Sequence, residues 1–425
     1  MLCLVILGMK FIAAFLVAIA LVCVHTISAT AAPPTVTDEQ LELLFTRFVS
    51  AHSKTYPSAQ VLSRFNTFKA NFARIVAHNS RVPRPTYTLG INSFADLSPA
   101  EFAQMYRLDQ PLARPRFRKD NTNAAAKSAS QSLSSSFSNI PGFDLSESDI
   151  VALAKMNSNV NADSSERKST RLMPKGVGAT ISTTNTLPSY LTDAAAAASD
   201  LKDDPPGAIK DWRLVGALNP VRDMSTCSAS YAFATMASLE AATYITKGQL
   251  PSLSTQQVVD CSEIYGNAGC SGGFIDSTFE YAIANGICDE ATYPYKATRG
   301  DCYESKCSPP AGVMAEYIAP ANATDEALMA IVYNGVVAVG MHLPADMQFY
   351  TGGVFNGPCD SEPNAALAVI GYDITEAAAA DLGRYFTLRQ SWGKAWGEEG
   401  HMRLAYGDGL CGINSMAAYA KLPRE

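Results

Sequence analysis

Apolar side chains recur at helical spacing near the start of the chain. Four of them occupy positions i, i+3, i+7 and i+10, namely Phe65, Phe68, Phe72 and Ile75. This spacing forms one stripe of an amphipathic helix. The segment from Tyr87 to Phe94 then alternates between apolar and polar residues. We therefore expect residues 38–104 to form a small, mainly helical domain.

The last half of the chain has a different pattern. A helix is predicted over Ser230 to Thr246, with Gly248 closing it. Four strand-like runs follow, and they are Val336–Met341, Leu367–Tyr372, Tyr385–Leu388 and His401–Ala405. Helices first and strands later predict an α+β domain of two lobes over residues 208–425.

Residues 105–207, between these two regions, are rich in Ser, Ala and Asn and lack the pattern of a core. So long a stretch without periodicity is typical of a linker. One or two helical turns are expected at Asp149 to Met156. The short basic cluster from Arg114 to Lys119 is interpreted as solvated linker or as a processing site.

The N-terminus has the layout of a secretory signal peptide. Residues 11–24 are apolar, Lys10 precedes them, and Ala29-Thr30-Ala31 offers small residues for cleavage. Fourteen residues are short for a membrane span. We expect residues 1–31 to be a signal peptide, with an uncleaved anchor as the alternative. The resulting localisation is the secretory pathway, ending outside the cell or in a lysosome or vacuole, with no stable membrane span after cleavage.

Composition and charge narrow the class of partner. The chain has 425 residues, 47% of them hydrophobic and 17% charged, which fits a globular protein with a substantial core. Its net charge is −7 and its pI is about 5.4. Because phosphate binding needs a basic face, nucleic acid is excluded as the expected partner.

The cysteines are confined to the last region. Without Cys3 and Cys23 of the signal segment, eight remain, and all follow residue 226. An even number in one region of a secreted chain indicates a disulfide framework. A zinc site is the weaker alternative, because only His342 and His401 lie in this half. We expect no metal and no cofactor.

Ten short motifs of the last region occur together in one order. They are Asp211-Trp212-Arg213, Gly216-Ala217, Asn219-Pro220-Val221, Ala232-Phe233, Gly269-Cys270-Ser271-Gly272-Gly273, Tyr293-Pro294-Tyr295, Gly352-Gly353-Val354-Phe355, Gly371-Tyr372, Ser391-Trp392-Gly393 and Trp396-Gly397-Glu398. The region thereby resembles the papain/cathepsin L-like cysteine proteases over nearly its whole length. The resemblance implies a papain-like fold with a helical left lobe and a β-barrel right lobe.

The first region resembles the inhibitory propeptide of the same family. Its spaced helix motif is present as Gln60, Arg64, Phe68, Asn71, Ile75 and Asn79, with only the leading glutamate changed. A second motif is intact as Gly90, Asn92, Phe94 and Asp96. The resemblance implies that residues 38–104 form an inhibitor domain that packs on the mature domain and runs backwards through its cleft. The chain's own propeptide is therefore one expected partner.

Four positions depart from the family's catalytic pattern. The stretch around the nucleophile reads Cys227-Ser228-Ala229-Ser230-Tyr231, so Ser230 stands at the nucleophile position. By the same resemblance, Ala365 stands at the general base, Gln390 at the residue that orients the base, and Met224 at the oxyanion donor. No catalytic residue of the family is then intact.

The chemistry of these substitutions predicts loss of activity. A papain-type thiol is activated by depression of its pKa until it is a thiolate. A serine hydroxyl needs a base within hydrogen-bond reach, and alanine supplies none. A methionine cannot donate to an oxyanion, and loss of such a donor costs about 3–4 kcal/mol.

The two remaining histidines of this region do not align with the base position. His342 falls at the end of a strand that flanks the cleft in the family, and it is interpreted as a polar strand-end residue. His401 is interpreted as a packed core histidine. Trp392 and Trp396, which shield the family's active site, are interpreted as core residues.

The peptide-binding surface is better preserved. Gly272 and Gly273 match the backbone ladder that grips an extended peptide. The apolar specificity pocket implied by the resemblance consists of Phe274, Gly340, Ala366 and Met416. The alternative is that these residues simply hold the lobes together. An extended peptide or protein segment is the expected ligand.

The resemblance also implies the pairing of the cysteines. The bridges are Cys227–Cys270, Cys261–Cys302 and Cys359–Cys411, which leaves Cys288 and Cys307 for a fourth. Each bridge is expected to stabilise the fold by about 2–4 kcal/mol. Asn322-Ala323-Thr324 is an acceptor sequon that suits an exported domain.

The leading hypothesis is an inactive papain-like cysteine peptidase homologue, a pseudoprotease with a retained peptide-binding cleft and a decoy or regulatory role. The alternative is an active hydrolase that uses Ser230 with a non-standard base. A third interpretation is a copy without a selected function.

Overall fold

The structure is a computed structural model that describes residues 36–112, 208–303, 316–318 and 324–422. The proposed signal peptide, most of the linker, Cys307 and the sequon at Asn322 lie outside these ranges. No helix within them is long and apolar enough to cross a membrane. The chain divides into two compact units, one ending at Phe65 and the other beginning at Asn66, and each is described by itself.

The first unit contains α2, Asp38–Ala51, and the first turns of α3, Ser58–Asn79. A capping box starts α2: the Thr37 hydroxyl accepts from the Gln40 amide, and the Gln40 side chain accepts from the Thr37 amide. The Phe45 ring lies 5.5 Å from the Phe65 ring, centroid to centroid. Aromatic packing of α2 on the start of α3 therefore forms the core of this unit.

The second unit begins within the predicted helix. Phe68 and Ile75 of α3 are buried, as their shared stripe predicted. Asn71 is buried beside them, and its side-chain amide donates to the carbonyls of Ala95 and Leu97 at 2.9 and 2.8 Å. A polar residue on this apolar stripe is thus satisfied by the loop between Leu89 and Pro99.

Nine strands form one mixed sheet within the described residues. They are β1 Tyr87–Leu89, β2 Ile209–Asp211, β3 Glu316–Ile318, β4 Val337–Met341, β5 Tyr350–Phe355, β6 Ala365–Asp373, β7 Tyr385–Arg389, β8 His401–Ala405 and β9 Met416–Lys421. The order is β1-β5-β8-β7-β6-β4-β9-β3, and β2 also pairs with β6. All pairs are antiparallel except β5 with β8.

The prediction of a β-barrel is wrong. The strand order runs from β1 to β3 without returning, and these two end strands do not pair with each other within the described residues. A barrel needs its first and last strands to join. Here one end is instead extended by β1, which the inhibitor segment contributes, so the sheet is open.

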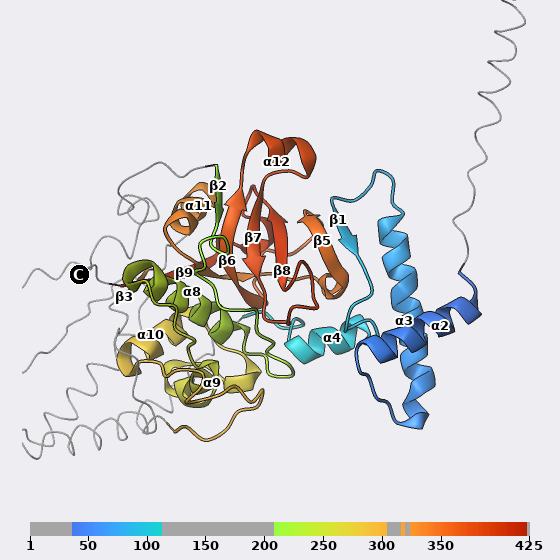
Figure 1. Cartoon of the computed structure of the whole chain (residues 1–425), viewed down its shortest axis with the longest axis horizontal. Coiled ribbons are helices and arrows are strands. Elements are labelled where there is room, and N and C mark those ends of the chain that lie inside the picture. The colour runs from blue at the N-terminus through green and yellow to red at the C-terminus, as the bar shows by residue number, and fades with distance from the viewer. Residues whose placement is uncertain (1–35, 113–207, 304–315, 319–323, 423–425) are drawn as a thin grey trace, which may run out of the picture. The chain divides into compact units, whose positions relative to one another are not determined.

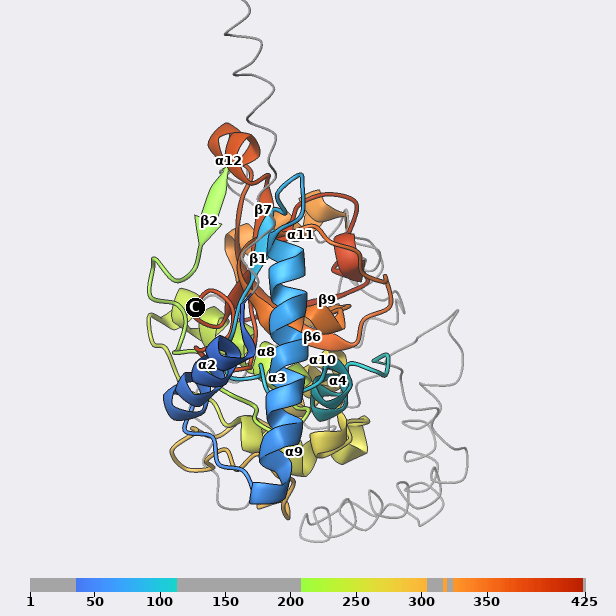
Figure 2. The same cartoon turned by 90° about the vertical axis from the view of Figure 1, so that its right-hand side faces the viewer.

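After α3, the described part of the second unit contains six further α-helices. They are α4 Pro99–Tyr106, α8 Ser230–Lys247, α9 Thr255–Cys261, α10 Ile275–Asn285, α11 Asp325–Asn334 and α12 Glu376–Asp381, with 3₁₀ turns at Ser262–Tyr265, Gly269–Ser271, Ala345–Phe349 and Leu410–Gly412. In Figures 1 and 2, α9 and α10 lie near α8 on the helical side of the molecule, next to the sheet.

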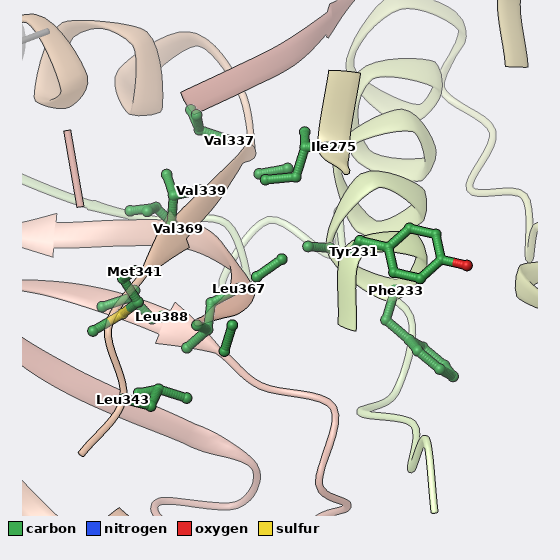
Figure 3. Close-up of a cluster of buried hydrophobic side chains, with 14 of the residues drawn as sticks. Tyr231, Phe233, Ile275, Val337, Val339, Met341, Leu343, Leu367, Val369 and Leu388 are labelled. Carbon is green, nitrogen blue, oxygen red and sulfur yellow. The ribbon is translucent and has the colours of Figure 1, made fainter. Parts of the chain in front are cut away.

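Helix α8 is the centre of the core. Its residues from 230 to 241 are all buried, and Gly248 ends it in the left-handed region at φ 70°. Figure 3 shows apolar side chains of the strands, among them Val339 and Leu367, on one side of this helix, and the ring of Tyr231 on the other. A helix that is apolar on most faces must be enclosed on most faces, and here the sheet encloses one side while α9 and α10 cover another.

The inhibitor segment is part of this sheet. Strand β1 pairs antiparallel with β5, with Tyr87 opposite Gly353, and Figure 1 shows the two strands side by side. Gly353 has φ +91°, and a side chain there would meet the Thr86 carbonyl oxygen at 2.4 Å. Only glycine permits this approach of the two backbones.

Three cysteine pairs carry disulfides in the structure, and they are the pairs that the resemblance implied: Cys227–Cys270, Cys261–Cys302 and Cys359–Cys411. Cys288 is also disulfide-bonded. Because Cys307 lies outside the described residues, the pairing of these last two cysteines stays a prediction.

The packing of Phe102 gives a testable consequence. Its ring is fully buried and lies 4.9 Å from the ring of Trp392 and 5.2 Å from that of Phe94. We expect Phe102→Ala to lower the unfolding free energy of the full chain by about 3–5 kcal/mol, because it leaves a cavity. The control Ile264→Ala removes a side chain that is 82% exposed and should change it by less than about 0.5 kcal/mol. Equal effects in chemical denaturation would contradict this packing.

Candidate functional site

The predicted nucleophile position lies at the first residue of α8. Ser230 is only 9% exposed, and its hydroxyl oxygen accepts a hydrogen bond of 3.3 Å from the Ala366 amide of β6. The preceding residue, Ala229, gives the helix no side-chain cap. The hydroxyl therefore bridges the helix and the sheet at the point where the two meet.

No thiol stands near this hydroxyl in the described part of the chain. Cys227 is three residues away but is bonded to Cys270. Every cysteine that the structure describes is in a disulfide, so none can ionise to a thiolate.

The residue predicted to stand at the base position carries only a methyl group. Ala365 is the first residue of β6, is 3% exposed, and stands opposite Met341 of β4. Its neighbour Ala366 supplies the amide that reaches Ser230. The structure thus brings the nucleophile and base positions together, and neither a thiol nor an imidazole stands at either of them.

Met224 and Gln390 are brought together by Ser391. The Ser391 amide donates to the Gln390 Oε1 at 2.7 Å, and its hydroxyl lies 3.4 Å from the Met224 sulfur. Met224 and Gln390 are both 2% exposed. Within the described residues, Gln390 Nε2 has no hydrogen-bond partner. The side chain of Gln390, the predicted orienting residue, therefore holds no imidazole in the described part of the chain.

The inhibitor segment lies over this site. A cavity of about 180 Å³ separates it from the cleft, and both sides contribute to its wall. The lining residues are Tyr106, Arg107, Gln110, Pro111, Leu112, Ser228, Ser230, Tyr231, Gly266, Ala268, Ser271, Gly272, Gly273, Phe274 and Asn364.

Two side chains near Ser230 and Ala365 hold residues 105–112, which continue the inhibitor segment beyond α4. The Ser228 hydroxyl donates to the Met105 carbonyl at 3.3 Å, and the Asn364 side-chain amide donates to the Leu108 carbonyl at 2.9 Å. The Leu112 amide donates to the Pro363 carbonyl at 2.7 Å. Sequence reasoning missed Ser228 and Asn364, although their place beside Ala229 and Ala365 was a signal.

The predicted peptide-binding residues fall into two groups. Gly272, Gly273 and Phe274 line the cavity. A side chain at Gly273 would meet the ring of Tyr231 at 2.7 Å, so the backbone lies directly on that ring.

The other three predicted pocket residues are not part of the cavity's described lining. Gly340 of β4 stands opposite Ala366 of β6 on one side and Met416 of β9 on the other. The structure therefore brings these three together on the sheet.

The two histidines have partners of their own. His342 Nδ1 accepts from the Asp360 amide at 3.2 Å. His401 is 7% exposed, and its Nδ1 lies 3.1 Å from the Glu398 carbonyl oxygen. Because a carbonyl only accepts, Nδ1 carries the proton in the neutral ring. Burial, followed by the charge of Arg213, lowers the pKa of His401 to about 4. His401 is thus a packed core histidine.

The two tryptophans are core residues, and Trp392 also contacts the inhibitor segment. Trp392 and Trp396 are buried, and their rings lie 4.9 Å apart. The ring of Tyr106 lies 5.0 Å from that of Trp392. No group of His, Cys, Asp and Glu in the described residues could hold a metal ion.

The pKa of His401 predicts a pH dependence of stability. The neutral ring is favoured in the folded state, since the folded pKa of about 4 is below the ordinary histidine pKa of 6.5. The unfolded chain therefore takes up this proton first as the pH falls, and the stability present above pH 6.5 is lost toward pH 4. Between pH 7.5 and 4.5 the wild type should lose about 2–3 kcal/mol more unfolding free energy than His401→Gln. His342→Gln, the control, should keep the wild-type dependence; identical pH profiles for all three proteins would contradict this environment.

Comparison with known proteins agrees with this architecture. The profile described as papain family cysteine protease matches residues 207–421, and that of the cathepsin propeptide inhibitor domain (I29) matches residues 45–102. Cysteine proteinase EP-B 1 of Hordeum vulgare is 31% identical over 396 residues, which cover 90% of this chain and 84% of that protein.

Two solved structures of precursors are similar over most of the chain. A recombinant stem bromelain precursor aligns with a TM-score of 0.63 at 26% identity, covering 90% of this chain and 99% of that one. The proform of the ragweed pollen cysteine protease Amb a 11 aligns with a TM-score of 0.64 at 26% identity, covering 92% and 97%. The chain has a papain-like fold preceded by a helical propeptide, and it belongs to the papain family of cysteine proteases.

Proposed function

We propose that this papain-family protein is a pseudoprotease, which holds extended peptide segments in its cleft and does not cleave them. The observation that carries the proposal is the environment of Ser230. Its hydroxyl oxygen accepts from a backbone amide, and no described cysteine is free to act in its place.

The direction of that hydrogen bond argues against a serine nucleophile. A serine attacks only when a neighbouring base accepts its proton. Ala366 N–H instead donates to the oxygen, and the position of the base is a methyl group. A bond that occupies a lone pair of the hydroxyl makes that oxygen less nucleophilic.

The surroundings of Met224 support the same conclusion. An oxyanion hole needs donors aimed at the developing charge. The sulfur at this position is in contact with the hydroxyl of Ser391, and a thioether has no proton to donate. Repairing the nucleophile alone would therefore still leave the negative charge without its side-chain donor.

Binding of an extended segment is supported by the inhibitor itself. Residues 105–112 occupy the cleft through hydrogen bonds from Ser228 and Asn364 to their backbone carbonyls. Contacts to main-chain atoms tolerate many side chains, so another extended segment could be held in the same way. A decoy or regulatory role follows from binding without cleavage.

The cellular setting is part of the proposal. Disulfides persist in oxidising compartments, and three are present. Together with the signal-peptide pattern of residues 1–31, they support export through the secretory pathway. We retain the division into signal peptide 1–31, inhibitor domain 38–104, linker 105–207 and peptidase-like domain 208–425 as part of this proposal, and the first residues of the linker, 105–112, continue the inhibitor segment through the cleft.

Rebuilding the site tests the proposal. The quadruple variant Ser230→Cys, Ala365→His, Gln390→Asn and Met224→Gln replaces nucleophile, base, orienting residue and oxyanion donor together. We expect it to cleave a peptide with an apolar side chain at least about a hundredfold faster than any of the four single variants, because such residues act as a unit. The matched control is the triple variant that keeps Ser230, which should stay inert.

Two outcomes would contradict the proposal. Cleavage by the unchanged protein that Ser230→Ala abolishes would favour a serine hydrolase. A repaired protein that folds with its disulfides intact, yet cleaves nothing, would mean that the cleft no longer binds peptides as the family's cleft does.

A further inference from the structure

The wall of the cavity between residues 106–112 and the cleft carries charge of one sign only. Among the described residues that line it, Arg107 is the one that carries a charge. Its other polar side chains are hydroxyls and amides, including that of Ser230. The wall therefore combines one cation with neutral polar groups, and no carboxylate opposes it.

Three acceptors of the residues that line this wall are already engaged. Gln110 Oε1 accepts from Arg107 Nη2 at 2.5 Å. Asn364 Oδ1 accepts from the Leu343 amide at 2.8 Å. The Gly272 carbonyl accepts from the Ala268 amide at 2.8 Å.

Donors in the same wall have capacity to spare. The guanidinium of Arg107 has five N–H donors, and one of them reaches Gln110. The Ser230 oxygen accepts from Ala366, and in the described part of the chain no acceptor takes its proton. Ser230 is 91% buried, so water is a poor substitute for that acceptor. A molecule that binds to these two donors must bring acceptors, and the guanidinium favours a negative one.

Apolar side chains also line this cavity. Phe274 and Leu112 line the cavity, and Pro111 lies beside them. A volume of about 180 Å³ suits one amino-acid residue and does not suit a long peptide. A carboxylate attached to one apolar side chain matches both halves of the wall.

We propose that this cavity binds the C-terminal residue of a peptide, with Arg107 and Ser230 donating to its carboxylate and Phe274 and Leu112 enclosing its apolar side chain. The site is composite, because the inhibitor segment supplies Arg107 and the cleft supplies Ser230. It rests on the proposed function, since Ser230 serves as a donor and not as a nucleophile.

The inference assigns the inhibitor segment a second role. It stays in place and completes a pocket, so the protein with its propeptide attached is the form that binds. A ligand with a free carboxylate is distinguished from one with an amide by the charge facing Arg107. Isosteric amides lack this charge, and a charge-assisted hydrogen bond is roughly twice as strong as a neutral one.

The test uses the full chain and two small probes, N-acetyl-L-leucine and its uncharged analogue N-acetyl-L-leucinamide, in calorimetric titration. We expect the carboxylate to bind at least tenfold more tightly than the amide. Arg107→Gln should abolish that ratio, and Arg107→Lys should keep most of it, because it keeps the charge. The control Arg384→Gln, which removes a surface cation outside the cavity, should change nothing. Unchanged thermal unfolding of each variant establishes that folding is not the cause.

Ser230→Ala separates this inference from the proposed function. We expect it to weaken the carboxylate about tenfold and to leave the amide within twofold. Equal affinity of the two probes, or a ratio that survives Arg107→Gln, would overturn the carboxylate site and leave the pseudoprotease proposal intact. Hydrolysis of N-acetyl-L-leucinamide that Ser230→Ala abolishes would contradict the pseudoprotease proposal instead, and the affinity ratio measured with N-acetyl-L-leucine would still report on the site.

Discussion

The packing of α8 against β6 is the contact on which the rest of the second unit depends. The helix is buried over residues 230–241, and its apolar side chains fill the space between the sheet and α10. This packing places Ser230 against Ala366 and fixes the cleft at the N-terminal end of the helix. This contact belongs to the core, and it requires neither a thiol nor an imidazole at the end of the helix.

The inhibitor segment is likewise held by contacts that need no catalytic thiol or imidazole. Its strand β1 extends the sheet through β5, its ring Phe102 packs on Trp392, and its backbone is held by Ser228 and Asn364. These contacts use backbone pairing, buried aromatic area and neutral hydrogen bonds, and none of them requires a thiolate or an imidazolium.

Much of the fold could be predicted from the sequence, because helices and strands follow local periodicity. The stripe of Phe68 and Ile75 became the buried face of α3, and Gly248 ended α8 as expected. Closure of the barrel was predicted wrongly, since it depends on which distant strands meet at the ends of the sheet. In this chain the inhibitor segment supplies one end strand, and periodicity carries no information about such pairing.

The site was predictable in position but not in its contacts. Motif spacing led to Ser230 and Ala365, which the structure brings together where α8 meets β6. The roles of Ser228 and Asn364 were not predictable, because each depends on a segment more than a hundred residues away in the chain. The spare donors of Arg107 likewise appear only when its neighbours in space are known.

The central claim is that Ser230 is not a nucleophile. The most direct measurement is digestion of a broad peptide library by the purified chain and by its Ser230→Ala variant, at pH values from 4 to 8, with products read by mass spectrometry. The account predicts identical product profiles for the two proteins at every pH. Products that form with the unchanged chain and disappear with Ser230→Ala would contradict it.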